Sequence, residues 1–190
     1  MHFVRDAFSQ VGCGAGVREK SQDPSPQASA TRGGGVLSPS LRPGLILCLG
    51  NPDRGDDGVG HLVGLLLREQ VPQHVVIEYQ DGSALELLER LHGVDSALFV
   101  DAALTGAPPG TVHVFDCTAG DMPAAKPGAS SHGLGIAEAI AMARVLHELP
   151  RVCRLYAIEG VNFTPGASIS AAVRVAAEKL AAMLACAAMV

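Results

Sequence analysis

The sequence predicts an α/β fold: a three-layer, mostly parallel twisted sheet flanked by helices, in one domain. Short apolar runs alternate along the chain with segments whose apolar residues recur at helical spacing. This alternation is typical of strands joined by covering helices. In addition, polar residues gather directly after the apolar runs, where an open parallel sheet places its ligand sites.

The first strand and helix lie within residues 45–67. Residues 45–49 (LILCL) are apolar throughout, as expected of a strand covered on both faces. Gly50-Asn51-Pro52 then has the residues of a turn. After Asp56-Asp57-Gly58, apolar residues at helical spacing predict a helix: Val59, Leu62, Val63, Leu66 and Leu67.

The next elements follow the same pattern. Residues 75–79 read as a second strand that ends before Asp81-Gly82, and Ser83 is placed to cap a helix over 84–91. Residues 96–100 form a third strand that leads into Asp101.

The second half of the chain completes the sheet. A β-branched, alternating segment at 111–115 predicts a strand after Pro108-Pro109-Gly110, and a polar loop is expected over 117–130. Ser131 opens a helix that is expected to reach about His147. Residues 153–158 form another strand, and Ser168 or Ser170 caps a last long helix.

Residues 1–43 differ in composition from the rest. They are rich in Gly, Ser and Pro, and no period of 2 or 3.6 residues is sustained. This predicts a flexible N-terminal extension over 1–43 and a single α/β domain over 44–190.

Composition excludes several function classes. The 190 residues include 14 Lys and Arg against 19 Asp and Glu, a net charge of −5, whereas nucleic-acid binders usually carry a basic patch. No run of about 20 apolar residues could span a membrane. The N-terminus lacks the apolar region of a secretory signal, so we expect a cytoplasmic protein that binds neither nucleic acid nor membrane.

Three potential metal ligands come from separate segments that the fold should bring together: Asp57, Asp101 and His132. Carboxylate and imidazole donors suit zinc, nickel or another divalent transition metal, and three protein ligands leave a position open for substrate or water. Each residue also has a simpler explanation. Asp56 or Asp57 could cap the helix near Gly58, Asp101 could bind a loop backbone, and a lone histidine is often structural.

The turn after residue 49 does not suit a phosphate. It matches neither G-x-G-x-x-G nor G-x-x-x-x-G-K-[ST], and its carboxylates would repel an anion. We therefore expect no dinucleotide or other organic cofactor.

Four motifs resemble the nickel–iron hydrogenase maturation proteases. Leu49-Gly50-Asn51 with residues 56–60 (DDGVG) resembles the opening G-x-G-N…D-D/E-G-x-G of that family. The other three similar motifs are Phe99-Val100-Asp101-Ala102, Ser131-His132-Gly133-Leu134, and Ile158-Glu159-Gly160 with Phe163 and Gly166. The similarity runs in order from about residue 45 to residue 184. Cys48 departs from the family's first glycine, and residues 1–43 have no counterpart.

The resemblance implies a protease-like domain that removes the C-terminal extension of a hydrogenase large-subunit precursor after nickel insertion. It places nickel ligands at Asp57, Asp101 and His132, with the nickel supplied by the substrate. Asp57 and Asp101 are then the candidate catalytic carboxylates. Asn51, Asp56 and Glu159, at the same strand ends, are candidate substrate-binding residues, and a monomer suffices.

Two alternatives stay open at this stage. One is a non-catalytic, nickel-binding accessory protein of hydrogenase maturation that uses the same three ligands. The other is an esterase like the peptidyl-tRNA hydrolases, whose opening L-G-N-P-G resembles Leu49-Gly50-Asn51-Pro52. The acidic balance and Asp56-Asp57 disfavour the latter.

Overall fold

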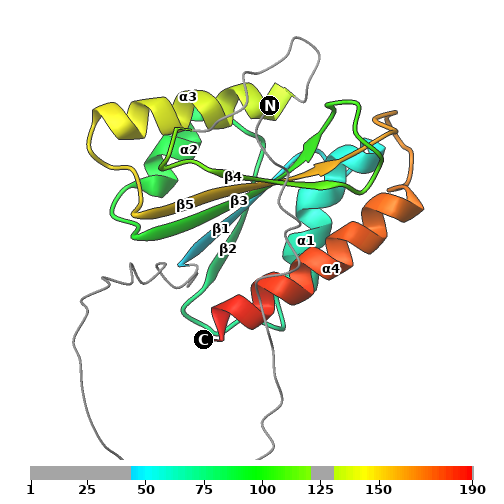
Figure 1. The fold of residues 1–190 in the computed structure, drawn as a ribbon, viewed down its shortest axis with the longest axis horizontal. Helices are drawn as coiled ribbons and strands as arrows, with labels where there is room; N and C mark the ends of the chain where they lie inside the picture. Colours follow the sequence, from blue (N-terminus) through cyan, green and yellow to red (C-terminus); the bar gives the residue numbers. More distant parts are fainter. Residues whose placement is uncertain (1–43, 121–130, 190) are drawn as a thin grey trace, which may run out of the picture.

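A five-stranded sheet forms the centre of the fold in the computed structural model, which describes residues 44–120 and 131–189 and, at residues 131–134, the backbone alone (Figure 1). The expected extension over 1–43 and residues 121–130 of the expected loop lie outside the described residues. The strand order is β2-β1-β3-β5-β4, and all neighbours are parallel except β4 and β5. The strands are β1 (Leu45–Leu49), β2 (Val76–Gln80), β3 (Ser96–Ala103), β4 (Val112–Asp116) and β5 (Val152–Glu159).

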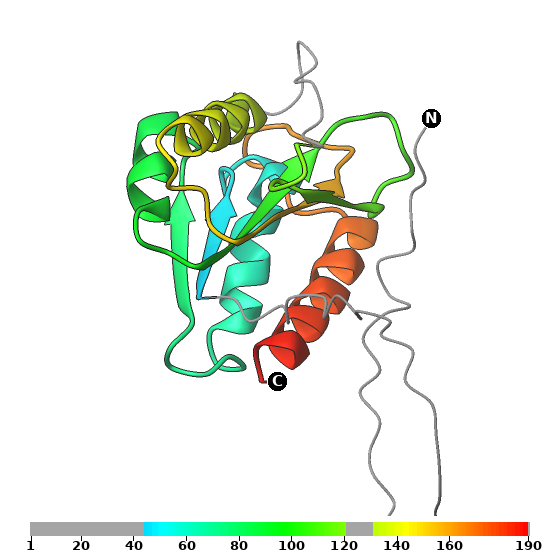
Figure 2. The same ribbon diagram turned by 60° about the vertical axis from the view of Figure 1, so that its left-hand side comes forward.

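Helices cover both faces of the sheet (Figures 1 and 2). The short 3-10 helix η1 (Gly55–Gly58) leads into α1 (Val59–Leu67), which shares one face with α4 (Ala171–Ala188). The opposite face carries α2 (Ala84–Leu91) and α3 (Ser131–Val145). The predicted three-layer α/β architecture is therefore confirmed.

Strand β1 shows why the sheet has two apolar layers. Its alternate side chains Ile46 and Cys48 belong to the α1/α4 core, whereas Leu45, Leu47 and Leu49 belong to the α2/α3 core. All five are buried. The uninterrupted apolar run is thus required because neither face of β1 meets solvent.

The chain changes direction across the sheet between β1 and β3. From β1 it crosses through α1 to β2 on one side, and then returns through α2, on the other face, to β3 on the other side of β1. In open α/β sheets, ligands bind at the carboxyl ends of the two strands between which the strand order reverses, which here are β1 and β3. Asp57 follows β1, and Asp101 lies near the end of β3.

Two strands are longer than the sequence indicated. Strand β3 continues to Ala103 and β5 to Glu159, because Asp101, Ala102 and Ala103 continue the parallel pairing with β5. Asp101 therefore lies within a central strand rather than in the loop after it. Within the described residues, no helix has both the length and the apolar character needed to cross a bilayer.

Candidate functional site

The turn after β1 places Asp57 at the carboxyl edge of the sheet. Gly50 has φ +114°, and a Cβ there would collide with the Asp57 carbonyl oxygen, so the turn needs glycine. The Asp57 carboxylate accepts a hydrogen bond from the Asn51 backbone N–H (3.3 Å), and its Oδ2 lies 3.8 Å from Nη1 of Arg54. The Asp57 side chain is 2% exposed, so it is held just below the surface of this turn.

Close packing brings η1 and α1 onto the end of β3. A Cβ on Gly60 would lie 2.7 Å from the Val100 carbonyl oxygen and would also strike that of Leu49. The start of α1 therefore rests directly on β1 and β3, and η1 contacts β3 as well. Asp57 and Asp101 thus lie at the same edge, at the crossover point.

Asp101 is buried in strand β3, with 2% of its side chain exposed. Its Oδ1 accepts a hydrogen bond from the Ala102 N–H (2.8 Å). By strand alternation it shares the side of Ala97 and Phe99, which face α2 and α3.

Helix α3 begins at this edge too. A Cβ on Gly135 would collide with the Gly82 carbonyl oxygen, in the loop that leads from the carboxyl end of β2 into α2. The first turn of α3, which includes His132, therefore starts near the strand ends that carry the two aspartates. The His132 side chain lies outside the described residues.

The predicted three-ligand metal site stays a prediction. Among the side chains that the structure describes, no three His, Cys, Asp or Glu residues are grouped closely enough to hold a metal ion. That search covers Asp57 and Asp101 but not His132. A cation at this edge would need donors from His132 or from the molecule that carries it.

Asp56, next to Asp57, has a different environment. Its carboxylate is fully buried and accepts four hydrogen bonds: from the N–H groups of Val161 (2.8 Å), Asn162 (2.9 Å) and Ser170 (2.7 Å), and from the Ser170 hydroxyl (3.0 Å). Burial raises the pKa of Asp56, but these hydrogen bonds outweigh it and hold the pKa below its usual value. Asp56 therefore fixes the segment between β5 and α4, and the substrate contact expected from the sequence stays a prediction.

Glu159, at the end of β5, has a similar role: like Asp56, it is a buried carboxylate that holds a loop by hydrogen bonds, and we call these two residues clamps. Its 1%-exposed carboxylate accepts hydrogen bonds from the Thr105 N–H (2.7 Å), the Thr105 hydroxyl (2.9 Å) and the Gly106 N–H (2.8 Å), and lies 3.2 Å from His113 Nε2. Burial raises the pKa of Glu159, but these bonds bring it below its usual value. Glu159 thus fixes the loop after β3, and its expected substrate contact likewise stays a prediction.

Asn51, the third candidate substrate-binding residue, is exposed. Its side-chain Oδ1 accepts a hydrogen bond from the Asp53 N–H (2.9 Å), which rigidifies the turn. Of the three candidates, Asn51 is the one that an incoming molecule can reach directly.

The capping alternative for the two aspartates is wrong. Gly58 occupies the N-cap position of α1, and neither Asp56 nor Asp57 caps the helix with its side chain. Ser170 does lie at the N-cap position of α4, as expected, but its hydroxyl donates to Asp56 instead of capping the helix.

Several supporting residues were not predicted. Thr105, His113 and Ser170 bind carboxylates more than 40 positions away in the sequence, so no local spacing could have indicated these pairs. Arg54 had a local signal, because it precedes Asp57 by three residues.

Cys48, which departs from the family motif, lies in the apolar layer below the site. A Cβ on Gly64 of α1 would be 2.8 Å from Cys48 Sγ and 2.8 Å from Cε1 of Tyr79, so Gly64 makes room for both side chains. Burial raises the pKa of Cys48 to about 12, although a Gly64 backbone hydrogen bond opposes the shift. The thiol is therefore protonated and unreactive at neutral pH.

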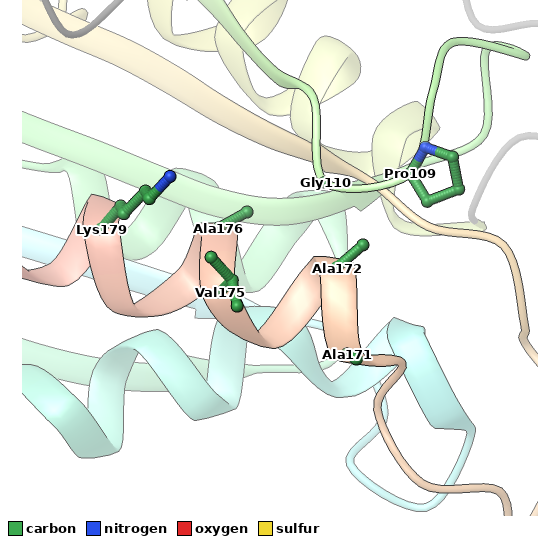
Figure 3. A pocket seen from close by; sticks show the side chains of 7 residues that line it. All are labelled: Pro109, Gly110, Ala171, Ala172, Val175, Ala176 and Lys179. Atoms are coloured by element: carbon green, nitrogen blue, oxygen red, sulfur yellow. The ribbon is translucent and has the colours of Figure 1, made fainter.

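A surface pocket lies beside the end of β5, where the Gly110 N–H donates to the Glu159 carbonyl oxygen (2.8 Å). It has a volume of about 440 Å³, between Pro109-Gly110 and the first turns of α4 (Figure 3). Its lining is mainly apolar, with Lys179 at one end, and includes none of the candidate site residues. The candidate site is therefore located at the carboxyl ends of β1 and β3, which carry Asp57 and Asp101, and not in this pocket.

Comparison with protein families identifies the chain. Residues 65–187 match the model of the HycI hydrogenase maturation protease family, which is well over half of the chain. The chain belongs to the hydrogenase maturation protease family. It is therefore a hydrolase, an endopeptidase of hydrogenase maturation, which sets aside the accessory-protein and esterase alternatives. The match includes Asp101 and Glu159 but begins after Asp57. The family model therefore does not cover the first motif, whose similarity to the family is seen in its sequence alone.

Solved structures share the fold. The hydrogenase maturating endopeptidase HybD from E. coli is 22% identical with a TM-score of 0.64, over 74% of this chain and 88% of that one. The [NiFe] hydrogenase maturation protease HycI from Thermococcus kodakarensis is 23% identical with a TM-score of 0.64, over 82% and 97% of the two chains. HybD from the same archaeon is 23% identical with a TM-score of 0.59, over 73% and 94%. The search of curated proteins found no match.

Proposed function

We propose that this endopeptidase removes the C-terminal extension of a nickel–iron hydrogenase large-subunit precursor after nickel insertion, and that the substrate's nickel is its recognition element. The observation that carries the proposal is the convergence of Asp57 and Asp101 at the β1/β3 crossover. Asp57, Asp101 and His132 would complete the coordination of a nickel ion that the precursor already holds.

The acidic character of this edge supports the proposal. Asp56, Asp57, Asp101 and Glu159 are all buried here. Four carboxylates at one edge favour the approach of a cation. A nickel ion that arrives with its own ligands needs only part of its coordination from this chain, which three protein donors would supply. No organic cofactor is needed for hydrolysis.

Hydrolysis requires an activated water and a group that takes its proton. In the proposed reaction water attacks the scissile carbonyl carbon, a carboxylate of Asp57 or Asp101 accepts its proton, and the leaving amine receives a proton as the C–N bond breaks. Nickel bound beside the water would lower the pKa of that water and serve the same end. Nη1 of Arg54, 3.8 Å from Oδ2 of Asp57, places a positive charge beside that carboxylate.

The test is cleavage of a purified precursor, followed by mass spectrometry. The wild-type protein should shorten the nickel-loaded precursor and leave the nickel-free precursor intact. His132→Ala and Asp101→Asn should abolish cleavage. Cleavage of both precursor forms at equal rates would contradict nickel recognition, and full cleavage by His132→Ala would contradict its role as a ligand.

Matched controls separate ligand loss from general damage. His74→Ala and Asp95→Asn replace a histidine and an aspartate that are exposed and lie on loops outside this edge. Both should cleave like the wild type. The monomeric state, the cytoplasmic location and the absence of nucleic-acid or membrane partners stay predictions, which light scattering and fractionation of cells can check.

A further inference from the structure

Arg54 carries a positive charge beside the candidate acids, and its side chain is not committed to the fold. Its Nη1 lies 3.8 Å from Oδ2 of Asp57, which is too long for a hydrogen bond. The Arg54 side chain is 44% exposed, and an ion pair of this kind adds little to stability. Among the described residues, the guanidinium group finds no hydrogen-bond acceptor, so its N–H groups are available to an incoming molecule.

The backbone that carries Arg54 is held on both sides. The Arg54 N–H donates to the Asn51 carbonyl oxygen (3.1 Å), and the Asp57 N–H donates to the Arg54 carbonyl oxygen (3.2 Å). The next residue, Gly55, has φ +59°, and a Cβ there would collide with the Asn162 carbonyl oxygen. The turn is therefore packed against the segment after β5, and it presents the base of the Arg54 side chain at a fixed place beside Asp57.

The proposed hydrolysis creates a charge that no residue named so far stabilises. When the water oxygen bonds to the scissile carbonyl carbon, a proton of the water passes to a carboxylate and the carbonyl π electrons move onto the carbonyl oxygen. The resulting oxyanion needs hydrogen-bond donors about 3 Å away, in place before the reaction. The planar guanidinium group of Arg54 has five N–H donors and a positive charge.

The position of Arg54 fits this task when Asp57 is the proton acceptor. A general base lies about 3 Å from the water oxygen, and a donor lies about 3 Å from the oxyanion. Since the water oxygen and the oxyanion are bonded to the same carbon, the base and the donor must be near neighbours. Nη1 of Arg54 and Oδ2 of Asp57 meet this requirement at 3.8 Å.

We propose that Arg54 is a catalytic residue that donates hydrogen bonds to the oxyanion of the tetrahedral intermediate, while Asp57 accepts the proton of the attacking water. The inference rests on the proposed function and extends it. When the intermediate collapses, the electron pair of the oxyanion reforms the carbonyl group, the C–N bond breaks, and the proton on Asp57 passes to the leaving nitrogen. Arg54 gives up no proton in this cycle, so it contributes its charge and its hydrogen bonds.

The test measures kcat and KM for cleavage of the nickel-loaded precursor by Arg54 variants. Arg54→Gln and Arg54→Ala should lower kcat at least 100-fold and leave KM within about threefold, because an interaction made only in the transition state is lost. Arg54→Lys keeps the charge without the planar fork, so its kcat should fall only about tenfold. Guanidinium ion at millimolar concentration should raise the kcat of Arg54→Ala at least tenfold.

A matched control is available at the amino ends of β3 and β5. Arg151 Nε lies 3.8 Å from Asp95 Oδ1 there, and both side chains are exposed. Arg151→Ala therefore removes an exposed arginine from an ion pair of the same length. This variant should keep the wild-type kcat and gain nothing from guanidinium ion.

Three results would each overturn the inference while the proposed function stands. The first is a kcat in Arg54→Gln close to that of the wild type. The second is a lower KM at unchanged kcat, which would make Arg54 only a counter-ion that competes with nickel for Asp57. The third is a loss of kcat that Arg54→Lys shares in full and guanidinium ion does not restore. A wild-type protein that cleaves no nickel-loaded precursor would instead overturn the proposed function itself.

Discussion

Asp56 and Asp57 are neighbours in the sequence, yet their carboxylates lie in different kinds of environment. Asp56 accepts four hydrogen bonds from residues more than 100 positions away, in the segment between β5 and α4. Asp57, by contrast, accepts a hydrogen bond from Asn51 and lies 3.8 Å from Arg54, and both partners belong to its own turn. On the neighbouring strands, Glu159 binds the N–H groups of Thr105 and Gly106, and Asp101 Oδ1 accepts from the N–H of the next residue, Ala102.

The difference separates two tasks at one edge of the sheet. A carboxylate that binds distant backbone groups stabilises the fold, because each of those groups would otherwise be buried without a partner. A carboxylate held mainly by its own turn can exchange its contacts for a cation at a smaller cost to the fold. Substitutions can test this division directly.

The largest expected effect is on activity at Asp57. Asp57→Asn keeps an oxygen that can accept the Asn51 N–H but removes the charge, so cleavage should fall at least 100-fold while the free energy of unfolding changes by at most about 1 kcal/mol. Cleavage kinetics and urea unfolding measure the two effects. Near-normal cleavage, or a decrease in the free energy of unfolding as large as that of Asp56→Ala, would show that Asp56 and Asp57 do not differ in role.

Asp56→Ala should have the largest effect on stability. It leaves three N–H groups and a hydroxyl without their acceptor, and we expect a loss of about 3–5 kcal/mol in the free energy of unfolding. Urea unfolding measures it, with Asp95→Ala as the exposed control. A loss below about 1 kcal/mol would show that Asp56 is not a clamp.

Glu159 allows a finer test, because its hydrogen bonds divide between two oxygens. Glu159→Ala should cost about 2–4 kcal/mol. Glu159→Gln should recover most of this, since its amide oxygen can accept from Thr105 and Gly106 while its NH₂ donates to the Thr105 hydroxyl and to neutral His113. Unfolding experiments give the energies, and NMR of His113 reports its tautomer. Equal losses in the two variants would mean that the charge matters more than the hydrogen bonds.

The smallest expected effect is a pH dependence of stability. The pKa values of Asp56 and Glu159 are lowered by folding, so their contributions are present above the unfolded-state values near 4 and are lost as the pH falls below them. Unfolding between pH 7 and 3 should show this decrease, and Asp56→Asn/Glu159→Gln should flatten it.

Asp116 needs a parallel control in that experiment. Its pKa is also low, because hydrogen bonds from Thr118 and Ala119 outweigh the effect of burial. Asp116→Asn should therefore be introduced into the wild-type protein and into the Asp56→Asn/Glu159→Gln variant. If the slope survives in the triple variant, its origin lies in other groups and the clamps do not account for it.

The architecture could be predicted because it follows from local patterns. The apolar run at residues 45–49 fits only a strand between two layers, and the helical spacing after Gly58 predicts a helix that covers one of them. The candidate acids could be located for the same reason, since parallel strands bring their carboxyl ends to one edge. The exact ends of β3 and β5 could not be predicted, because the pairing between these two strands extends both of them beyond their apolar runs.

The roles of the individual acids were beyond the reach of sequence reasoning. The sequence proposed Asp56 and Glu159 as substrate-binding residues, which stays a prediction, and it gave no sign that both bind the chain's own loops. Thr105, His113 and Ser170, which make these contacts, are far from their carboxylates in the sequence. Nothing in the DDG tripeptide distinguishes its first aspartate from its second.

The sequence by itself determined the layered α/β fold and the edge at which the acids gather, because both follow from hydrophobic periodicity and turn residues. Only the tertiary structure decided which of the acids would bind distant backbone N–H groups. The physical reason is that a buried carboxylate must find donors, and those donors come from segments that are adjacent only after the chain has folded.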